Sequence, residues 1–346
     1  MKAPASLRVT AAEWLPATTV KAGGALAEGR ITQAEADAVG YDELPVSDGQ
    51  SAPEMAVLAG RRALERSGVA PESVAAVLHA STYYQGHDFW SPAHYVADRT
   101  GAVQAVPLGI QQMCNGGGAA LEAALTRHLA LPDHGPVLVT TADRFCEPGF
   151  DRWSGDYGVW YGDSGTAAVV RRGGDAAGEG ELLLEALVTE AAPDLEVVHR
   201  DLSGFQDAPH EVDATVDVRR TKKAFLTGAG REPFVARLKE TTTRVVAAAL
   251  AEAELAPDDP SLRAVLLPRL GRSTARDIYG PAVAAVTPAP AVDLGAATGH
   301  LGAGDLCSNL AALSGAGPWG LLPGERAVVL SAGAGFTWSG VVVRRP

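Results

Sequence analysis

The stretch PLGIQQMCNGGGAALEAAL, residues 107–125, reads as an apolar strand, a glycine-rich turn and a helix. Residues 292–313, VDLGAATGHLGAGDLCSNLAAL, have the same layout. In this register Cys114 and His300 occupy equivalent places, each just before a helix. An internal match of this kind predicts one structural unit that is used twice along the chain.

The match extends on both sides of these stretches. Residues 53–81 read as a helix, a Gly/Pro break and the buried strand VAAVLHA, and residues 233–271 repeat that order. PVLVTTADRF at 136–145 pairs in the same way with RAVVLSAGAGF at 326–336. Alternating strands and helices predict an α/β fold in which helices cover sheets buried on both faces. Two such halves, packed face to face, would bring their two helix N-termini to one site.

Composition and charge narrow the class of protein. The chain has 346 residues, of which 47% are hydrophobic and 20% charged, as in ordinary globular proteins. The sequence shows no membrane-length apolar run and no secretory signal at its start, so we expect a cytoplasmic protein without a membrane partner. A net charge of -12 argues against nucleic acid as the main partner. Three cysteines without a zinc-binding spacing predict no disulfide, and one reactive thiol is compatible with them.

Cys114 is the candidate nucleophile. A thiol at the glycine-rich start of a helix lies near the positive end of the helix dipole, which favours the thiolate. The alternative is a buried, inert cysteine. His300 is then the candidate base, and Asp305 is the candidate group that orients it, because glycines between them let the chain curl. A Cys–His–Asp set is typical of acyl transfer. The competing interpretation of Asp305 is a helix N-cap.

Other residues complete the candidate site. The glycine-rich SAGAGFTW at 331–338 is able to present a backbone N–H to an oxyanion, and His199 lies between the halves where a substrate pocket is expected. Cys146, Cys307 and Asp163 are expected to be structural. The remaining histidines are expected at the surface or satisfied in the core, namely His79, His87, His94, His128, His134 and His210.

Two basic clusters are candidates for contacting the phosphates of an acyl donor. The first, in DVRRTKKAF at 217–225, comprises Arg219, Arg220, Lys222 and Lys223, and the second comprises Arg269 and Arg272. The alternative for both clusters is solvated surface.

Three motifs resemble β-ketoacyl carrier-protein synthase III enzymes of the thiolase superfamily. They are MCNG at 113–116, DRWSGDYGVWYGDSGTAAVV at 151–170 and GERAVVLSAGAGFTWSGVVVR at 324–344. The resemblance covers almost the full chain and implies a five-layered αβαβα fold and a homodimer. It also implies that Cys114 is acylated and that the N–H groups of Cys114 and Ala334 form the oxyanion hole.

The chain departs from that family where condensation is catalysed. Condensing members carry HQAN where this chain has LLPRLGRST, so Arg269 replaces their histidine and Arg272 their asparagine. They carry GNTSAAS where this chain has GHLGAGD, so His300 replaces a second asparagine. Without those donors an enolate is poorly stabilised, and losing one such donor typically costs ~10²–10³ in rate. The pattern is similar to the synthase III-like acyltransferases of antibiotic and polyketide pathways.

We therefore expect a ping-pong acyltransferase of secondary metabolism. It would take an acyl group from CoA or acyl carrier protein and pass it to a hydroxyl, an amine or a second carrier, without a metal or a permanently bound cofactor. Two alternatives are a starter-unit ketosynthase III that condenses an acyl group with malonyl carrier protein and a non-catalytic partner that binds acyl carriers. The expected organisation is a nucleophile half at 1–175, an insertion at 176–230 that shapes the substrate pocket, and a His/Asp half at 231–346.

Overall fold

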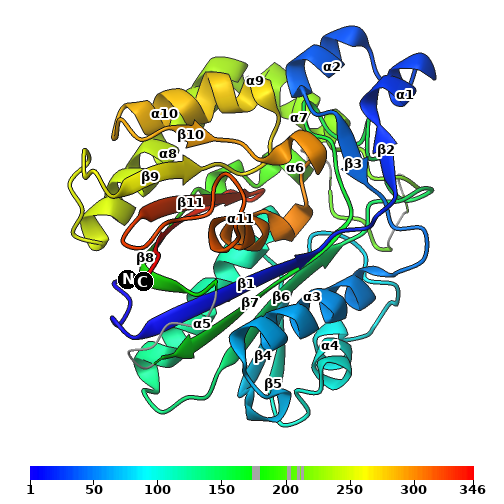
Figure 1. Ribbon diagram of the computed structural model, residues 1–346. Coiled ribbons are helices and arrows are strands. Elements are labelled where there is room, and N and C mark those ends of the chain that lie inside the picture. The colour runs from blue at the N-terminus through cyan, green and yellow to red at the C-terminus, as the bar shows by residue number, and fades with distance from the viewer. Residues whose placement is uncertain (174–179, 201–203, 209–210, 212–213) are drawn as a thin grey trace.

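The computed structural model describes residues 1–173, 180–200, 204–208, 211 and 214–346. Ten strands form one sheet in the order β10-β9-β11-β12-β8-β1-β7-β6-β4-β5 (Figure 1). The first half of the chain supplies β1 (Leu7–Trp14), β4 (Ala76–Ala80), β5 (Val106–Ile110), β6 (Val137–Asp143) and β7 (Ser164–Arg172). The second half supplies β8 (Leu182–Ala191), β9 (Leu262–Leu266), β10 (Ala291–Val292), β11 (Arg326–Gly333) and β12 (Thr337–Arg344).

The two halves of this sheet have the same topology. In the first, β5–β4 and β4–β6 are parallel and β6–β7 and β7–β1 are antiparallel. In the second, β10–β9 and β9–β11 are parallel and β11–β12 and β12–β8 are antiparallel. The halves join where β1 pairs with β8 at Arg8–Leu183 and Val9–Leu182. The predicted internal repeat is confirmed.

Helices complete five layers. Between the half-sheets lie α5 (Gly116–Ala130) and α11 (Asp305–Ser314), which contact each other and strands of both halves (Figure 1). The outer face of the first half-sheet is covered by α3 (Ala52–Ser67) and α4 (Pro92–Thr100), and that of the second by α8 (Arg231–Glu252) and α10 (Gly280–Ala284). This αβαβα arrangement confirms the predicted fold class.

Local signals explain these elements. A capping box formed by Ser51 and Glu54 starts α3, and Gly68 ends it in the left-handed conformation at φ 64°. The apolar strand β4 is buried throughout, as expected for a parallel strand covered on both faces. The edge strand β5 is an exception to the expectation of sheets buried on both faces, because Val106 and Leu108 are 55% and 39% exposed. An edge strand lacks a neighbour on one side, and the apolar pattern alone does not reveal this.

Smaller elements lie around the site. In the first half these are β2 (Thr19–Lys21), β3 (Glu43–Pro45), α1 (Ala22–Ala27) and α2 (Gln33–Val39). The segment 176–230 contains α6 (Val197–Arg200) and α7 (Val218–Ala229), and α9 (Arg272–Thr274) follows β9. That segment also contains β8, so its first part is a sheet strand and not an insertion. Among the helices of the described residues, none combines the length and the apolar character that crossing a bilayer requires.

Candidate active site

Cys114 lies in a single 3₁₀ turn, Met113–Asn115, that runs into the buried helix α5. Its side chain is partly exposed. The preceding residue, Met113, has a φ of 48°, an uncommon value for a residue with a side chain. Such a conformation costs on the order of 1–3 kcal/mol and is found most often at functional sites. The N-terminus of α5 therefore presents the thiol on a strained turn, next to N–H groups that stabilise negative charge.

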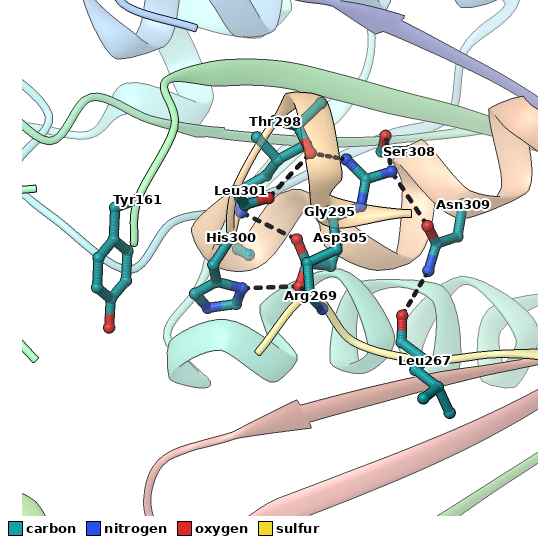
Figure 2. Close-up of polar contacts among 12 residues, drawn as sticks. Tyr161, Leu267, Arg269, Gly295, Thr298, His300, Leu301, Asp305, Ser308 and Asn309 are labelled. Carbon is teal, nitrogen blue, oxygen red and sulfur yellow. Dashed lines mark hydrogen bonds and ion pairs between the residues drawn. The ribbon is translucent and has the colours of Figure 1, made fainter. Parts of the chain in front are cut away.

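His300 and Asp305 form a buried pair, each 1% exposed (Figure 2). The Nδ1–H of His300 donates to Asp305 Oδ2 over 2.7 Å. The same carboxylate accepts the backbone N–H of Leu301 at 2.9 Å and that of Arg269 at 2.8 Å. Helix α11 begins at Asp305 itself, without a side-chain cap, so the N-cap interpretation is wrong. Gly302, at φ 60°, allows the turn that folds Asp305 back onto His300.

Neighbouring charges set the state of this pair. Burial alone would lower the pKa of His300, but the charges of Asp305 and Cys114 hold it well above its ordinary value. Burial alone would raise the pKa of Asp305, but His300 and Arg269 hold it below its ordinary value. Because Asp305 fixes the proton on Nδ1, Nε2 is the nitrogen left for the reaction. Nε2 is buried, and a hydrogen bond with the Cys114 side chain also acts to raise the pKa of His300.

Backbone contacts hold the two helix starts together. A Cβ on Gly117 of α5 would lie 2.7 Å from the carbonyl oxygen of Ala303, so only glycine permits this approach. The N–H of Ala303 donates to the buried carboxylate of Asp143 at 2.9 Å. Asp143 also accepts the N–H groups of Thr82 and Tyr83, and burial raises its pKa to about 6. Sequence reasoning missed Asp143, although it ends one of the repeated strands.

The segment that carries Ala334 lies against the turn that carries Cys114. A Cβ on Gly333 would lie 2.4 Å from the backbone nitrogen of Asn115 and 2.9 Å from the carbonyl oxygen of Gln112. These contacts bring the end of β11 alongside the nucleophile turn.

Arg269 is not a surface residue. It is 3% exposed, and its guanidinium donates to Thr298 at 2.7 Å, Ser308 at 2.7 Å and Asn309 at 3.1 Å (Figure 2). The expectation that it contacts a donor phosphate is therefore wrong. The guanidinium is enclosed behind Asp305, where its charge helps to keep that carboxylate ionised.

Two residues of the other basic cluster also point inward. Arg219 donates to Glu35 at 2.9 Å and to the carbonyl oxygens of Asp156 and Trp153. Lys222 donates to both carboxylate oxygens of the buried Asp156, at 2.5 and 2.7 Å. These internal contacts contradict the phosphate-binding expectation for Arg219 and Lys222. Arg220, Lys223 and Arg272 are exposed and remain candidates.

His199 and Tyr161 lie near the site. The ring of His199 packs against Phe336, with centroids 5.4 Å apart, shortly after Ala334 in the chain. Tyr161, which the motif analysis passed over, packs its ring on His300 with centroids 5.3 Å apart (Figure 2). The backbones of these two segments also pair, since His300 N donates to Trp160 O and Gly162 N donates to His300 O.

Asp163 and His79 have the internal contacts expected of structural residues, whereas the buried Nδ1 of His128 has no partner among the described residues. Asp163 accepts the N–H groups of Ser47 and Phe145 and the Arg152 guanidinium. Both ring nitrogens of the buried His79 have partners, and burial raises the pKa of the Cys307 thiol to about 12. Cys146 is partly exposed. Of the other histidines, His87 and His94 are exposed, His134 is half-buried, His128 is buried and His210 lies outside the described residues. In the described part of the chain, no group of three or more His, Cys, Asp or Glu side chains is placed to hold a metal.

Comparison with known proteins identifies the fold. No protein-family model and no curated protein sequence matches the chain. Among solved structures, the acyltransferase ChlB3 superposes with a TM-score of 0.87 and 27% identity, over 98% of this chain and 97% of that one. The synthase III FabH from Pseudomonas aeruginosa PAO1 gives 0.74 and 21%, over 99% and 98%. The priming β-ketosynthase of the R1128 polyketide pathway gives 0.77 and 19%, over 100% and 98%. The chain therefore has a ketosynthase III-like fold of the thiolase type and is similar in sequence and structure to an acyltransferase with that fold.

Proposed function

We propose that this chain is an acyltransferase of secondary metabolism, which moves an acyl group from a CoA or carrier-protein thioester through Cys114 to a hydroxyl or amine acceptor. The observation that carries the proposal is the buried His300–Asp305 pair, joined at 2.7 Å, together with the hydrogen bond and charge by which Cys114 acts on the same ring. A base held in this way beside a nucleophilic cysteine suits proton transfer to and from an acceptor. The similarity to the acyltransferase ChlB3 supports the same assignment.

Loading begins when the Cys114 thiol passes its proton to Nε2 of His300. The sulfur attacks the thioester carbon, and the oxyanion that forms is received by the N–H groups of Cys114 and Ala334. The intermediate collapses, its carbon–sulfur bond to the donor breaks, and His300 gives its proton to the departing thiolate. Acylation removes the negative charge of Cys114, which had raised the pKa of His300. The imidazole is therefore less basic after loading and is left neutral.

Discharge uses that neutral imidazole as a general base. Nε2 takes the proton of the acceptor hydroxyl or amine while the oxygen or nitrogen attacks the acyl carbon. The bond to Cys114 breaks, and its sulfur leaves as the thiolate, again paired with imidazolium. Asp305 keeps Nδ1 protonated and the ring oriented throughout. No redox step and no metal is required by this sequence.

Carbon–carbon bond formation is not expected. In the condensing relatives that the sequence resembles, a histidine and an asparagine stabilise the enolate formed on decarboxylation. Arg269 stands in place of that histidine, and its guanidinium is engaged by Thr298, Ser308 and Asn309. His300 stands in place of the asparagine, and its Nδ1 is held by Asp305.

Two parts of the proposal concern partners. The exposed cations Arg220, Lys223 and Arg272 are the remaining candidates for contacting phosphates of the donor. The exposed apolar residues Val106 and Leu108 lie on the edge strand β5, which a second copy of the chain would cover in a homodimer.

Intact-mass spectrometry of the acyl-enzyme tests the function. Wild type, Cys114→Ala and His300→Ala are exposed to a panel of acyl-CoAs and to malonyl carrier protein, with and without hydroxyl acceptors. We expect a single adduct on wild type, none on Cys114→Ala, and an adduct on His300→Ala that forms but discharges slowly. No carbon dioxide should be released from malonyl carrier protein.

Two other outcomes would replace the proposal. Decarboxylation of malonyl carrier protein with a β-keto product would make the chain a starter-unit ketosynthase, as the similarity to a priming β-ketosynthase allows. The absence of any adduct on Cys114 with every thioester would make it a binding partner without catalysis.

A further inference from the structure

A second polar cluster lies beside the catalytic pair, and none of the steps above uses it. Its centre is Asp156, which is 4% exposed and lies in the loop before β7. Lys222, from α7, donates to both oxygens of Asp156, and the hydroxyl of Tyr161 donates to one of them at 3.0 Å. We call Asp156, Tyr161, Lys222 and the nearby His199 the Lys222 cluster.

The Lys222 cluster adjoins the site on two sides. Tyr161 lies on the side of His300 opposite to Asp305 (Figure 2), and besides burial the charges of both Asp156 and Cys114 raise its pKa. His199 packs on Phe336, and Phe336 follows closely after Ala334. The cluster thus reaches from Tyr161, whose ring meets that of His300 edge to face, to the segment beside the turn that carries Cys114.

The Lys222 cluster carries little net charge. The ammonium of Lys222 and the carboxylate of Asp156 neutralise each other at 2.5 Å. Burial, together with the charge of Lys222, lowers the pKa of His199 to about 4, so its ring is neutral at pH 7. Tyr161 also stays protonated. A carboxylate or an ammonium brought here would lose its hydration without gaining an uncompensated opposite charge. A neutral polar group does not need such a charge.

Hydrogen-bonding capacity is nevertheless left over. An ammonium has three hydrogens, and the contacts of Lys222 to Asp156 account for two of them. Nδ1 of His199 is buried and has no partner among the described residues. A buried unpaired polar atom costs about 1–3 kcal/mol, so it calls for a partner. A hydroxyl group is able to accept from Lys222 and to hydrogen-bond with His199 at the same time.

We propose that the Lys222 cluster is a recognition subsite for a neutral hydroxyl group of the substrate, with Lys222 and His199 as the residues that contact it. The inference rests on the acyltransferase function proposed above and adds the substrate class: a hydroxylated acyl group or a polyhydroxylated acceptor. These two sources share one chemistry, and they act in different half-reactions. A hydroxyl on the acyl group is read during loading of Cys114, and one on the acceptor is read during discharge.

Matched thioesters test this proposal. The probes are 3-hydroxybutyryl-, 4-hydroxybutyryl- and 6-hydroxyhexanoyl-CoA, each compared with the CoA thioester that lacks the hydroxyl. Loading rates are measured on wild type, on His199→Phe, which keeps the ring packing on Phe336, and on the double variant Lys222→Met/Asp156→Asn, which removes both charges together. Lys21→Met is the matched control, because it breaks an exposed 2.7 Å pair with Glu43 elsewhere in the fold. Discharge is measured with glycerol against 1-propanol, after loading with acetyl-CoA.

Binding is measured alongside catalysis. Calorimetric titration of Cys114→Ala gives the affinity for both members of each CoA pair. It measures the preference for the hydroxyl group even if no acyl-enzyme forms, so failure of the acyltransferase function is distinguished from failure of the subsite. We expect wild type to favour at least one hydroxylated probe about tenfold or more, at loading or at discharge, as one added hydrogen bond to a charged group provides.

That preference should fall below about threefold in His199→Phe and in the double variant and stay unchanged in Lys21→Met. Equal rates for every pair in wild type, together with equal affinities for every pair in Cys114→Ala, would overturn the proposal. So would a preference that survives in both cluster variants, since it would then arise elsewhere in the site.

Discussion

Asp305→Asn is the substitution that probes the proposed base most directly. The carboxylate accepts three hydrogen bonds: Leu301 N on Oδ1, and Arg269 N and His300 Nδ1 on Oδ2. An asparagine amide has one accepting oxygen and one NH₂ group. Turned to keep the two contacts on Oδ2, it sets NH₂ against the N–H of Leu301. Turned the other way, it loses the hydrogen bonds from Arg269 N–H and His300 Nδ1–H.

The cost follows from that geometry. One buried N–H facing another donor should lower the free energy of unfolding by about 1–3 kcal/mol. The negative charge that raises the pKa of His300 also disappears, so the pKa of His300 falls. With a weaker and less firmly oriented base, we expect discharge of the acyl-enzyme to slow on the order of 10²–10⁴-fold.

Single-turnover discharge, followed by intact mass from pH 5 to 9, separates these effects. Discharge needs neutral His300, so the acid limb of the profile reports the apparent pKa of the His300–Asp305 pair, and it should move to lower pH in Asp305→Asn. The control is Asp163→Asn, which disturbs another fully buried carboxylate that accepts backbone N–H groups. It should lose at least as much stability, because it also leaves the Arg152 guanidinium without its carboxylate, but it should not move the limb. An acid limb that stays in place or rises in Asp305→Asn would refute the assignment of Asp305 as the group that charges and orients His300.

Three further predictions address neighbouring features. Arg269→Met leaves the acceptors on Thr298, Ser308 and Asn309 unpaired, so the free energy of unfolding in urea should drop by about 3–5 kcal/mol. It also removes a positive charge near Asp305, so the acid limb of discharge should move to higher pH, and a move to lower pH would contradict the role given to that charge. His79 is buried neutral with a pKa lowered to about 4 from 6.5, so wild type should lose about 3 kcal/mol of unfolding free energy relative to His79→Gln between pH 6.5 and 4, and parallel stability curves would argue against this. Gly333→Ala should slow loading at least ~10-fold, because its Cβ would force the Cys114 turn away from β11, and an unchanged loading rate would mean that this close approach is not needed.

The repeat made most of the architecture predictable from sequence. Strand, turn and helix recur at 107–125 and 292–313, and their hydrophobic spacing and glycines carry the topology of both halves. The strand β8 escaped prediction because it has no clear sequence counterpart and was assigned to an insertion. The exposure of β5 also escaped, because an apolar edge strand and an apolar central strand have the same pattern.

The site was predictable where its parts are close in sequence. Asp305 follows His300 by five residues with two glycines between them, and the contact between them needs little else. The burial of the Lys222 and Arg269 side chains was not predictable. A cluster of basic residues in the sequence does not show which side chain pairs with a buried carboxylate. The contacts of Asp143 with Ala303 and of Asp156 with Lys222 form only when segments far apart in the sequence come together.

The placement of the nucleophile and its base on opposite halves has a consequence for biosynthesis of the enzyme itself. Cys114 leaves the ribosome long before His300, and Asp143, Ala303 and Gly117 bring the two together only after the second half has packed onto the first. Until then the chain carries an ordinary cysteine without a proton-accepting partner. If the proposed acyl transfer takes place at this site, it therefore begins only once the second half has docked onto the first, and we expect a truncated or half-folded chain not to consume acyl thioesters.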